Sequence, residues 1–259
     1  MLKTAAFYRN YDKLQVLRNI AQSASSVDIY SCSGNLLRRI NWGGEKGAIK
    51  GLGWSEDEKL IIVTADGTVR CYADIHGDFT PFSLEHGAEE HGVLECRFWS
   101  TGFVAMLGNK SLVAVSRYSD PRPRLLASST ATGSGGSSNS VIHSWTVIPP
   151  SDSLSRSVEV LLGVDSTVMT VDASDRQDHS LTDGPFRHIS VSSNGQFVAL
   201  YTNDGKIWVV SGDFQMKLSE YDPRAKTQPK EMKWCGSSAV VLAWEDEIHL
   251  VGPNGAATK

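Results

Sequence analysis

Two histidines and three glutamates gather in one short segment of the sequence, residues 85–92, which read EHGAEEHG. Imidazole and carboxylate groups are zinc ligands, so the segment has the composition of a metal site. The two histidines, His86 and His91, are five residues apart, and no helix is expected there to bring them to one side. We therefore interpret the segment as a solvated loop between repeats, and we expect no bound metal.

Residues 108–111, with the sequence GNKS, end like a phosphate-binding loop. They lack the glycine that precedes the lysine of such loops, and we expect them in a hairpin rather than at a strand-to-helix turn. The chain also has no G-x-S-x-G elbow, no H-E-x-x-H motif and no G-x-G-x-x-G opening a helix. We therefore expect no catalytic residue, no cofactor and no enzymatic activity, and the sequence does not identify partner-binding residues.

The four cysteines are Cys32, Cys71, Cys96 and Cys235, spaced by 39, 25 and 139 residues without a C-x-x-C pair. The first residues, MLKTAAFYRNYDK, contain no apolar stretch typical of a secretory signal. Both features favour a reducing, cytosolic compartment. The net charge of −4 argues against a dedicated nucleic-acid binder. The longest apolar run, residues 239–244, is much shorter than the roughly 20 residues of a membrane span.

The elements that would position any of these side chains are short strands, because runs rich in Val, Ile, Tyr and Trp alternate with turn residues. Two segments match each other closely, residues 53–79 and 190–214. Each has a polar turn, an apolar strand, an Asp-Gly pair, a second strand and a Gly-Asp-Phe turn. We predict that Asp66-Gly67 and Asp204-Gly205 are equivalent hairpin turns of type I′, in which both central residues have positive φ.

Weaker copies of this unit fill the rest of the chain, with successive turns at positions 66, 109, 165, 204 and 246. A period of about 40 to 45 residues with four short strands is the signature of a β-propeller blade. We therefore predict an all-β, divergent WD-like β-propeller with about five full blades and a partial one at each end. Residues 27–42 match only the second half of the unit. We expect six tryptophans to lie on strands and pack between blades, Trp42, Trp54, Trp99, Trp208, Trp234 and Trp244.

The predicted organisation is an N-terminal segment, residues 1–26, followed by an incomplete propeller, residues 27–259. Within the propeller, residues 128–140 are mostly serine and glycine. Such a segment buries too little apolar surface to offset its ordering entropy, so we predict a flexible surface insertion that could be deleted at little cost in stability.

Ten motifs follow one another in an order typical of one family: AFYRNY (6–11), VDIYSCSG (27–34), GLGWSEDEKL (51–60), DGTV (66–69), HGDF (76–79), SWTV (144–147), FRHISVS (186–192), YTNDGKIW (201–208), KEMKWC (230–235) and VVLAWEDEIHLVG (240–252). In these motifs the chain resembles the N-terminal propeller region of the vacuolar protein sorting-associated protein 16 family. The motifs are structural and none marks a reactive site. Because the chain stops after a strand, we expect it to be a fragment of a longer protein.

The resemblance implies a seven-bladed N-terminal propeller followed by a long α-solenoid. It also implies a scaffold subunit of two membrane-tethering complexes, homotypic fusion and protein sorting and class C core vacuole/endosome tethering. These act in vesicle-mediated transport and fusion at late endosomes and the vacuole or lysosome, where the subunit is cytoplasmic and peripheral. The implied partners are the other class C subunits and a Sec1/Munc18-type SNARE regulator, which binds the solenoid that this sequence lacks.

One departure concerns the first blade. Family members usually have several tens of residues between the Phe-Tyr-Arg motif and the first Ile-Tyr-Ser strand, whereas only residues 12–28 lie there in this chain. We expect this shortfall to remove strands from the first blade. Two other functions stay open from the residues alone, a propeller enzyme with its site near a central channel and a WD-like peptide-binding module.

Overall fold

The computed structural model describes residues 26–127 and 140–258, apart from Cys32 and Leu154. It divides the chain into two compact units, residues 1–126 and 127–259, each of which is treated separately below. The expected N-terminal segment and nearly all of the Ser/Gly insertion lie outside the described residues. The boundary between the units adjoins that insertion in the sequence.

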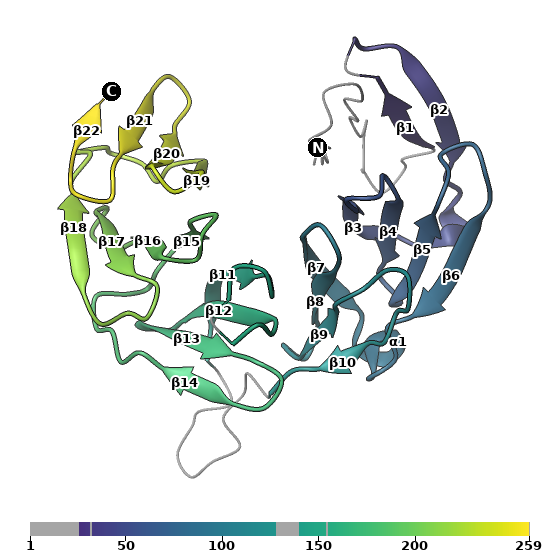
Figure 1. The fold of residues 1–259 in the computed structure, drawn as a ribbon, viewed down its shortest axis with the longest axis horizontal. Helices are drawn as coiled ribbons and strands as arrows, with labels where there is room; N and C mark the ends of the chain where they lie inside the picture. Colours follow the sequence, from purple (N-terminus) through teal and green to yellow (C-terminus); the bar gives the residue numbers. More distant parts are fainter. Residues whose placement is uncertain (1–25, 32, 128–139, 154, 259) are drawn as a thin grey trace. The chain divides into compact units, whose positions relative to one another are not determined.

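The described residues of the first unit form one two-stranded and two four-stranded antiparallel sheets (Figure 1). The first sheet is β1 (Ser26–Tyr30) and β2 (Leu36–Asn41). The second is β3 (Ile49–Trp54), β4 (Leu60–Thr64), β5 (Thr68–Tyr72) and β6 (Phe79–Ser83). The third is β7 (Val93–Phe98), β8 (Phe103–Leu107), β9 (Leu112–Val115) and β10 (Arg124–Leu125). Two short helices connect the sheets, η1 (Gly44–Lys46) and α1 (Ala88–His91).

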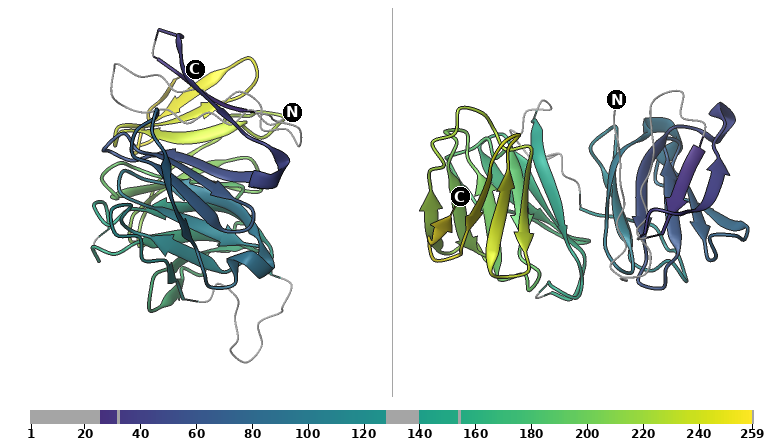
Figure 2. Two further views of the ribbon diagram at one scale, coloured as in Figure 1. Left: turned by 90° about the vertical axis from the view of Figure 1, so that its right-hand side faces the viewer. Right: turned by 90° about the horizontal axis from the view of Figure 1, so that it is seen from above.

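The second unit contains three four-stranded antiparallel sheets, which Figure 2 shows stacked face to face. They are β11 (Ile142–Ile148), β12 (Glu159–Val164), β13 (Thr167–Val171) and β14 (Arg176–Asp178); β15 (His188–Val191), β16 (Phe197–Tyr201), β17 (Ile207–Ser211) and β18 (Lys217–Tyr221); and β19 (Glu231–Cys235), β20 (Ala239–Ala243), β21 (Ile248–Val251) and β22 (Ala257–Thr258). In every sheet the strands pair with their neighbours in sequence, as in a propeller blade.

The sheets are held together by strands that are apolar on both faces. Ile61 on β4 packs toward the sheet β7–β10, and its neighbour Ile62 packs toward β1–β2; both are fully buried. Because successive side chains on a strand point to opposite faces, such a run stabilises two interfaces at once. The all-β fold of repeated four-stranded sheets is therefore confirmed. In the described part of the chain the first sheet has only two strands, as the half-repeat at residues 27–42 predicts.

The two Asp-Gly pairs lie at equivalent positions, between the second and third strands of the sheets β3–β6 and β15–β18. The predicted type I′ geometry is wrong. Only Gly67 and Gly205 have positive φ, 81° and 85°, and neither aspartate does. In each loop the aspartate carboxylate accepts a hydrogen bond from the threonine hydroxyl two residues earlier. This capping keeps the aspartate at negative φ, and a left-handed glycine then closes a longer hairpin loop.

The expectation that the tryptophans lie on strands is only partly right. Three of those considered lie one residue past a strand end, Trp42, Trp99 and Trp244. In each case the indole N–H donates to a nearby loop atom: to Gly47 O at 2.8 Å, Thr101 Oγ1 at 3.0 Å and Thr227 O at 2.8 Å. A buried or half-buried indole needs a partner for its N–H, and at these three strand ends a loop atom supplies it. Among the described residues, no helix is long and apolar enough to cross a bilayer.

Candidate functional site: a polar pocket in the second unit

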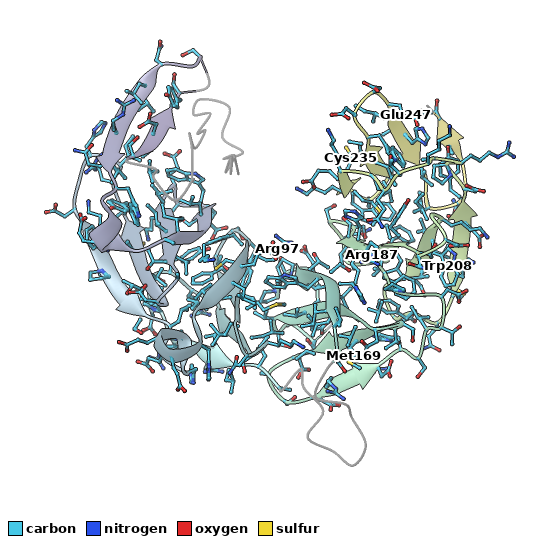
Figure 3. The ribbon with its side chains drawn as sticks, turned by 180° about the vertical axis from the view of Figure 1, so that it is seen from behind. Arg97, Met169, Arg187, Trp208, Cys235 and Glu247 are labelled. Atoms are coloured by element: carbon cyan, nitrogen blue, oxygen red, sulfur yellow. The ribbon has the colours of Figure 1, made fainter. Side chains whose placement is uncertain are left out.

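A pocket of about 550 Å³ lies at one end of two neighbouring sheets of the second unit, β11–β14 and β15–β18. Four loops line it, residues 149–158, 172–175, 192–196 and 212–216, which connect first to second and third to fourth strands. Antiparallel hairpins alternate between the two ends of a sheet, so these loops share one end. Figure 3 shows the side chains here, with Met169 marking β13 and Trp208 marking β17.

The lining of this pocket is acidic. It includes five carboxylates, on Asp152, Glu159, Asp172, Asp175 and Asp213, and it includes no lysine or arginine. Among the described residues, the ion pairs involve none of these five groups. Within the described part of the chain, none of the lysines or arginines found in ion pairs is paired with these carboxylates.

Two of the carboxylates are held by the turns that carry them. Asp172 Oδ1 accepts from the backbone N–H groups of Ser174 and Asp175, at 2.7 and 2.8 Å. These bonds, led by that of Ser174, lower the pKa of Asp172 against the opposing effect of burial. The Asp213 carboxylate accepts hydrogen bonds from the Ser211 hydroxyl and from the backbone N–H of Gln215, and both bonds lower the pKa of Asp213. Both groups are therefore anionic at neutral pH.

A third carboxylate, Glu159 at the start of β12, is fixed by serine hydroxyls. Its Oε1 atom accepts from Ser153 Oγ and from Ser155 Oγ, each at 2.6 Å. Ser153 is buried, so the loop before β12 is anchored beneath the pocket. Hydroxyl donors orient the carboxylate without neutralising it.

One aromatic ring, that of His179, belongs to the lining of this pocket. The ring of His179 stacks on Phe214, with centroids 3.9 Å apart and an interplanar angle of 18°. His179 Nε2 lies 2.7 Å from Thr170 Oγ1. Burial lowers the pKa of His179, and the nearby Asp178 opposes this only in part, so the imidazole is neutral at pH 7.

The chemistry that this pocket offers includes the recognition of a cation. Ionised carboxylates accept hydrogen bonds and attract cations, but those with lowered pKa do not serve as general acids at neutral pH. Among the described residues, no three His, Cys, Asp or Glu side chains are placed to hold a metal ion. A lysine or arginine side chain is the kind of group that fits five carboxylates beside an aromatic pair.

Solved structures similar to this chain are β-propellers. The β-propeller domain of Cps50 (Swd1) from Myceliophteria thermophila matches with a TM-score of 0.65 at 13% identity, over 99% of this chain and 85% of that one. The WD40 β-propeller domain of Doa1 matches with a TM-score of 0.66 at 14% identity, over 99% and 81%. At this identity the similarity shows the fold alone.

Similar sequences give the family. A probable vacuolar protein sorting-associated protein 16 homolog from Schizosaccharomyces pombe is 34% identical over 240 residues, and Protein VACUOLELESS1 from Arabidopsis thaliana is 28% identical over 264. The family model for the N-terminal region of Vps16 matches residues 5–259. The chain belongs to the Vps16 family. The two alignments include 90% and 94% of this chain. They include only 28% and 30% of the length of the two relatives.

The metal-like segment of this Vps16-family chain forms the connection between β6 and β7, and α1 lies within it. The His86 ring nitrogen Nε2 lies 3.1 Å from the backbone oxygen of Pro123, so this ring is engaged with the loop before β10. The expectation that this segment contains no helix is wrong, because α1 forms one helical turn within it, although the segment does connect two repeats. That no metal binds stays a prediction.

Residues 108–111 lie in the hairpin between β8 and β9, as the sequence predicts, and Lys110 there has φ of 68°. The described cysteines are free: Cys71 and Cys96 are buried, and Cys235 is exposed. Burial raises the pKa of both buried thiols, which makes them poor nucleophiles.

Sequence reasoning missed the polar pocket. The sequence does contain a sign of its turns. Several loops of the second unit carry an aspartate or asparagine, and such a side chain often accepts a hydrogen bond from the backbone N–H two residues later. What the pattern does not reveal is that three such loops, capped by Asp172, Asn194 and Asp213, and the loop 149–158 meet around one cavity.

Proposed function

We propose that this chain is the propeller part of a scaffold subunit of endosomal and vacuolar tethering complexes, and that it acts through protein–protein contacts. The match of residues 5–259 to the N-terminal region of Vps16 carries this proposal. Relatives in yeast and plants have names that refer to vacuolar protein sorting and to the vacuole. The partners that follow are the other class C subunits, with a Sec1/Munc18-type regulator bound through the rest of a longer chain.

The physical basis of such a role is surface presentation. Strands buried on both faces make each unit rigid, and the loops at the sheet ends are then held in fixed positions. We propose that the protein is not an enzyme, because its sequence carries none of the catalytic motifs considered above and its relatives are Vps16 homologues. Association with late endosomes and the vacuole or lysosome would be peripheral and would depend on the complex.

Assembly with purified class C subunits tests this role. We expect the chain to elute with at least one of them in size-exclusion chromatography, with the mass of the complex measured by light scattering. A full-length family member without the matching region should lose that subunit. Unchanged assembly of the truncated protein, together with no complex of the isolated chain, would contradict the proposal.

A WD-like peptide-binding role is the second candidate, and the acidic pocket favours it. A basic peptide segment supplies the cations that the described ion pairs do not supply to Asp172 and Asp213. Binding of an oligolysine peptide, lost on substitution of these two residues, separates this role from a scaffold that binds only folded subunits.

A further inference from the structure

A row of alternating cations and aromatic rings runs along the first unit, between the sheets β1–β2 and β3–β6. Its members, called the cation–aromatic row here, are Arg38, Trp42, Lys46, Arg70, Tyr72 and Phe79. They come from four elements: β2 and the residue after it, η1, β5 and β6. Figure 1 shows η1 lying beside β5 and β6 in this unit.

The sheet pairing explains why these side chains meet. Arg70 and Tyr72 are two residues apart on β5, so they share one face of the strand. Phe79 on β6 is the register partner of Tyr72, and the two rings are 5.4 Å apart. Trp42 and Tyr72 are buried, whereas Phe79 is 41% exposed. The row therefore has a fixed base and an accessible rim.

Arg70 occupies the centre of the row. Its guanidinium carbon lies 4.7 Å from the Trp42 ring centroid and 5.3 Å from that of Phe79. Lys46 Nζ lies 5.9 Å from the Trp42 ring, and Arg38 lies 5.8 Å from the Tyr72 ring. Such contacts hold cations close together by their attraction to the ring faces.

The charges of this row are not paired with carboxylates. Arg38 donates to the backbone oxygens of Ile75 and Gly77, Lys46 to that of Asn41, and Arg70 to that of Lys46 at 3.5 Å. Within the described residues none of the three cations belongs to an ion pair. Other cations of the same unit do, among them Arg39 with Asp28 and Arg97 with Glu95.

Arg70 is placed to receive an oxyanion. A guanidinium has five N–H donors in one plane, and among the described contacts of Arg70 only one of them is engaged. Ring contacts on Trp42 and Phe79 fix that group without using its donors. A fixed fork of donors is the partner that a carboxylate binds in two places at once.

We propose that the cation–aromatic row docks an acidic segment of a partner protein, with a carboxylate of that segment bound by Arg70. The inference rests on the proposed scaffold role and names the kind of segment the scaffold holds. Exposed acids are close to members of the row in the sequence: Glu45 precedes Lys46, and Asp74 and Asp78 lie between Tyr72 and Phe79. They would repel a broad anionic membrane surface more than a narrow peptide that contacts Arg70 alone, so a peptide is the favoured occupant.

Binding of a fluorescein-labelled oligoglutamate peptide to the purified chain, followed by anisotropy at low salt, tests this inference. We expect Arg70→Gln to weaken binding about tenfold, the loss of one charge-assisted contact of roughly 1.4 kcal/mol. Arg70→Lys keeps the positive charge but removes the paired N–H donors of the guanidinium. Its affinity for the peptide should therefore lie between that of the unaltered chain and that of Arg70→Gln. Arg97→Gln is the matched control, an exposed arginine of the same unit that is already paired, and it should bind like the unaltered chain.

Three outcomes overturn the inference. These are no peptide binding by the unaltered chain, equal binding by the chain and by Arg70→Gln, or Arg70-dependent binding to vesicles containing phosphatidylserine without peptide binding. If Arg70→Gln proves unstable, Arg70→Lys and Lys46→Gln supply the comparison. Assembly with class C subunits without peptide binding would refute this inference alone. Arg70-dependent peptide binding without assembly would instead refute the proposed function.

Discussion

The cation–aromatic row of the first unit and the acidic pocket of the second carry opposite charges, and within the described residues neither the three cations nor the five carboxylates belong to an ion pair. In the row, cations lie over ring faces and donate to backbone oxygens. In the pocket, carboxylates accept from serine hydroxyls and turn amides. Each region therefore fixes its charged groups with neutral partners and leaves the charge available to a ligand.

The two regions differ in how the fold supports them. The row lies on a sheet face, where side chains two residues apart stand together and buried rings can serve as supports. The pocket lies at sheet ends, where each turn satisfies its own aspartate and stays in place without a ring beneath it. Removing a buried ring from the row should therefore lower the stability of the fold. Replacing an aspartate in a pocket turn should mainly remove a negative charge.

Removing the ring beneath the row should have the largest effect. Trp42 is 6% exposed and belongs to the core between β1–β2 and β3–β6, so Trp42→Ala should lower the free energy of unfolding by about 3 to 5 kcal/mol. The matched change in the pocket, Phe214→Ala, removes a ring that is only partly buried and should cost less than half as much. Urea denaturation of both variants measures the difference. Equal losses would show that the two regions are supported in the same way.

Neutralising the pocket should change binding much more than stability. The double variant Asp172→Asn and Asp213→Asn keeps an oxygen acceptor for both turns but removes two charges. We expect its affinity for an oligolysine peptide to fall about tenfold, with binding of oligoglutamate unchanged. Anisotropy with both peptides checks the selectivity. Loss of binding to both would indicate that the turns had lost their structure.

The sequence predicts more of the fold than of these regions. The repeat at Asp66-Gly67 and Asp204-Gly205 places two hairpins correctly, because a turn depends on a few adjacent residues. Its exact type depends on a hydrogen bond from the threonine hydroxyl, which the Asp-Gly pair does not reveal. Arg70 and Trp42 are 28 residues apart in the sequence, and only the packing of two sheets brings them to 4.7 Å. No local pattern carries that information.

A smaller effect is expected from the pH dependence of the turn at Asp172. Hydrogen bonds from the Ser174 and Asp175 amides hold its pKa below the ordinary 3.8. Because the folded state holds the charged carboxylate better than the unfolded chain does, this group stabilises the fold at pH values above 3.8. That stabilisation is lost as the pH falls through the pKa of the folded state. Asp172→Ala should therefore be less stable at pH 7 by about 0.5 to 1 kcal/mol after solvent screening, and the gap should close below pH 3.8. A constant gap from pH 7 to pH 2 would mean that the carboxylate charge adds nothing to this turn.

The smallest effect concerns His179, the one titratable ring in the pocket wall. Burial lowers its pKa from the ordinary 6.5, so the neutral ring is favoured in the folded state. The folded protein binds its proton less readily than the unfolded chain, so the stability that the neutral ring contributes is present above pH 6.5 and decreases below it. His179→Phe keeps a ring against Phe214 but does not titrate, and its stability relative to the unaltered chain should rise between pH 7 and pH 5. His143→Phe serves as a control, since His143 lies on β11 outside the pocket lining. Thermal unfolding across this range measures both variants, and a difference that does not change with pH would show that the pocket wall tolerates a charged ring.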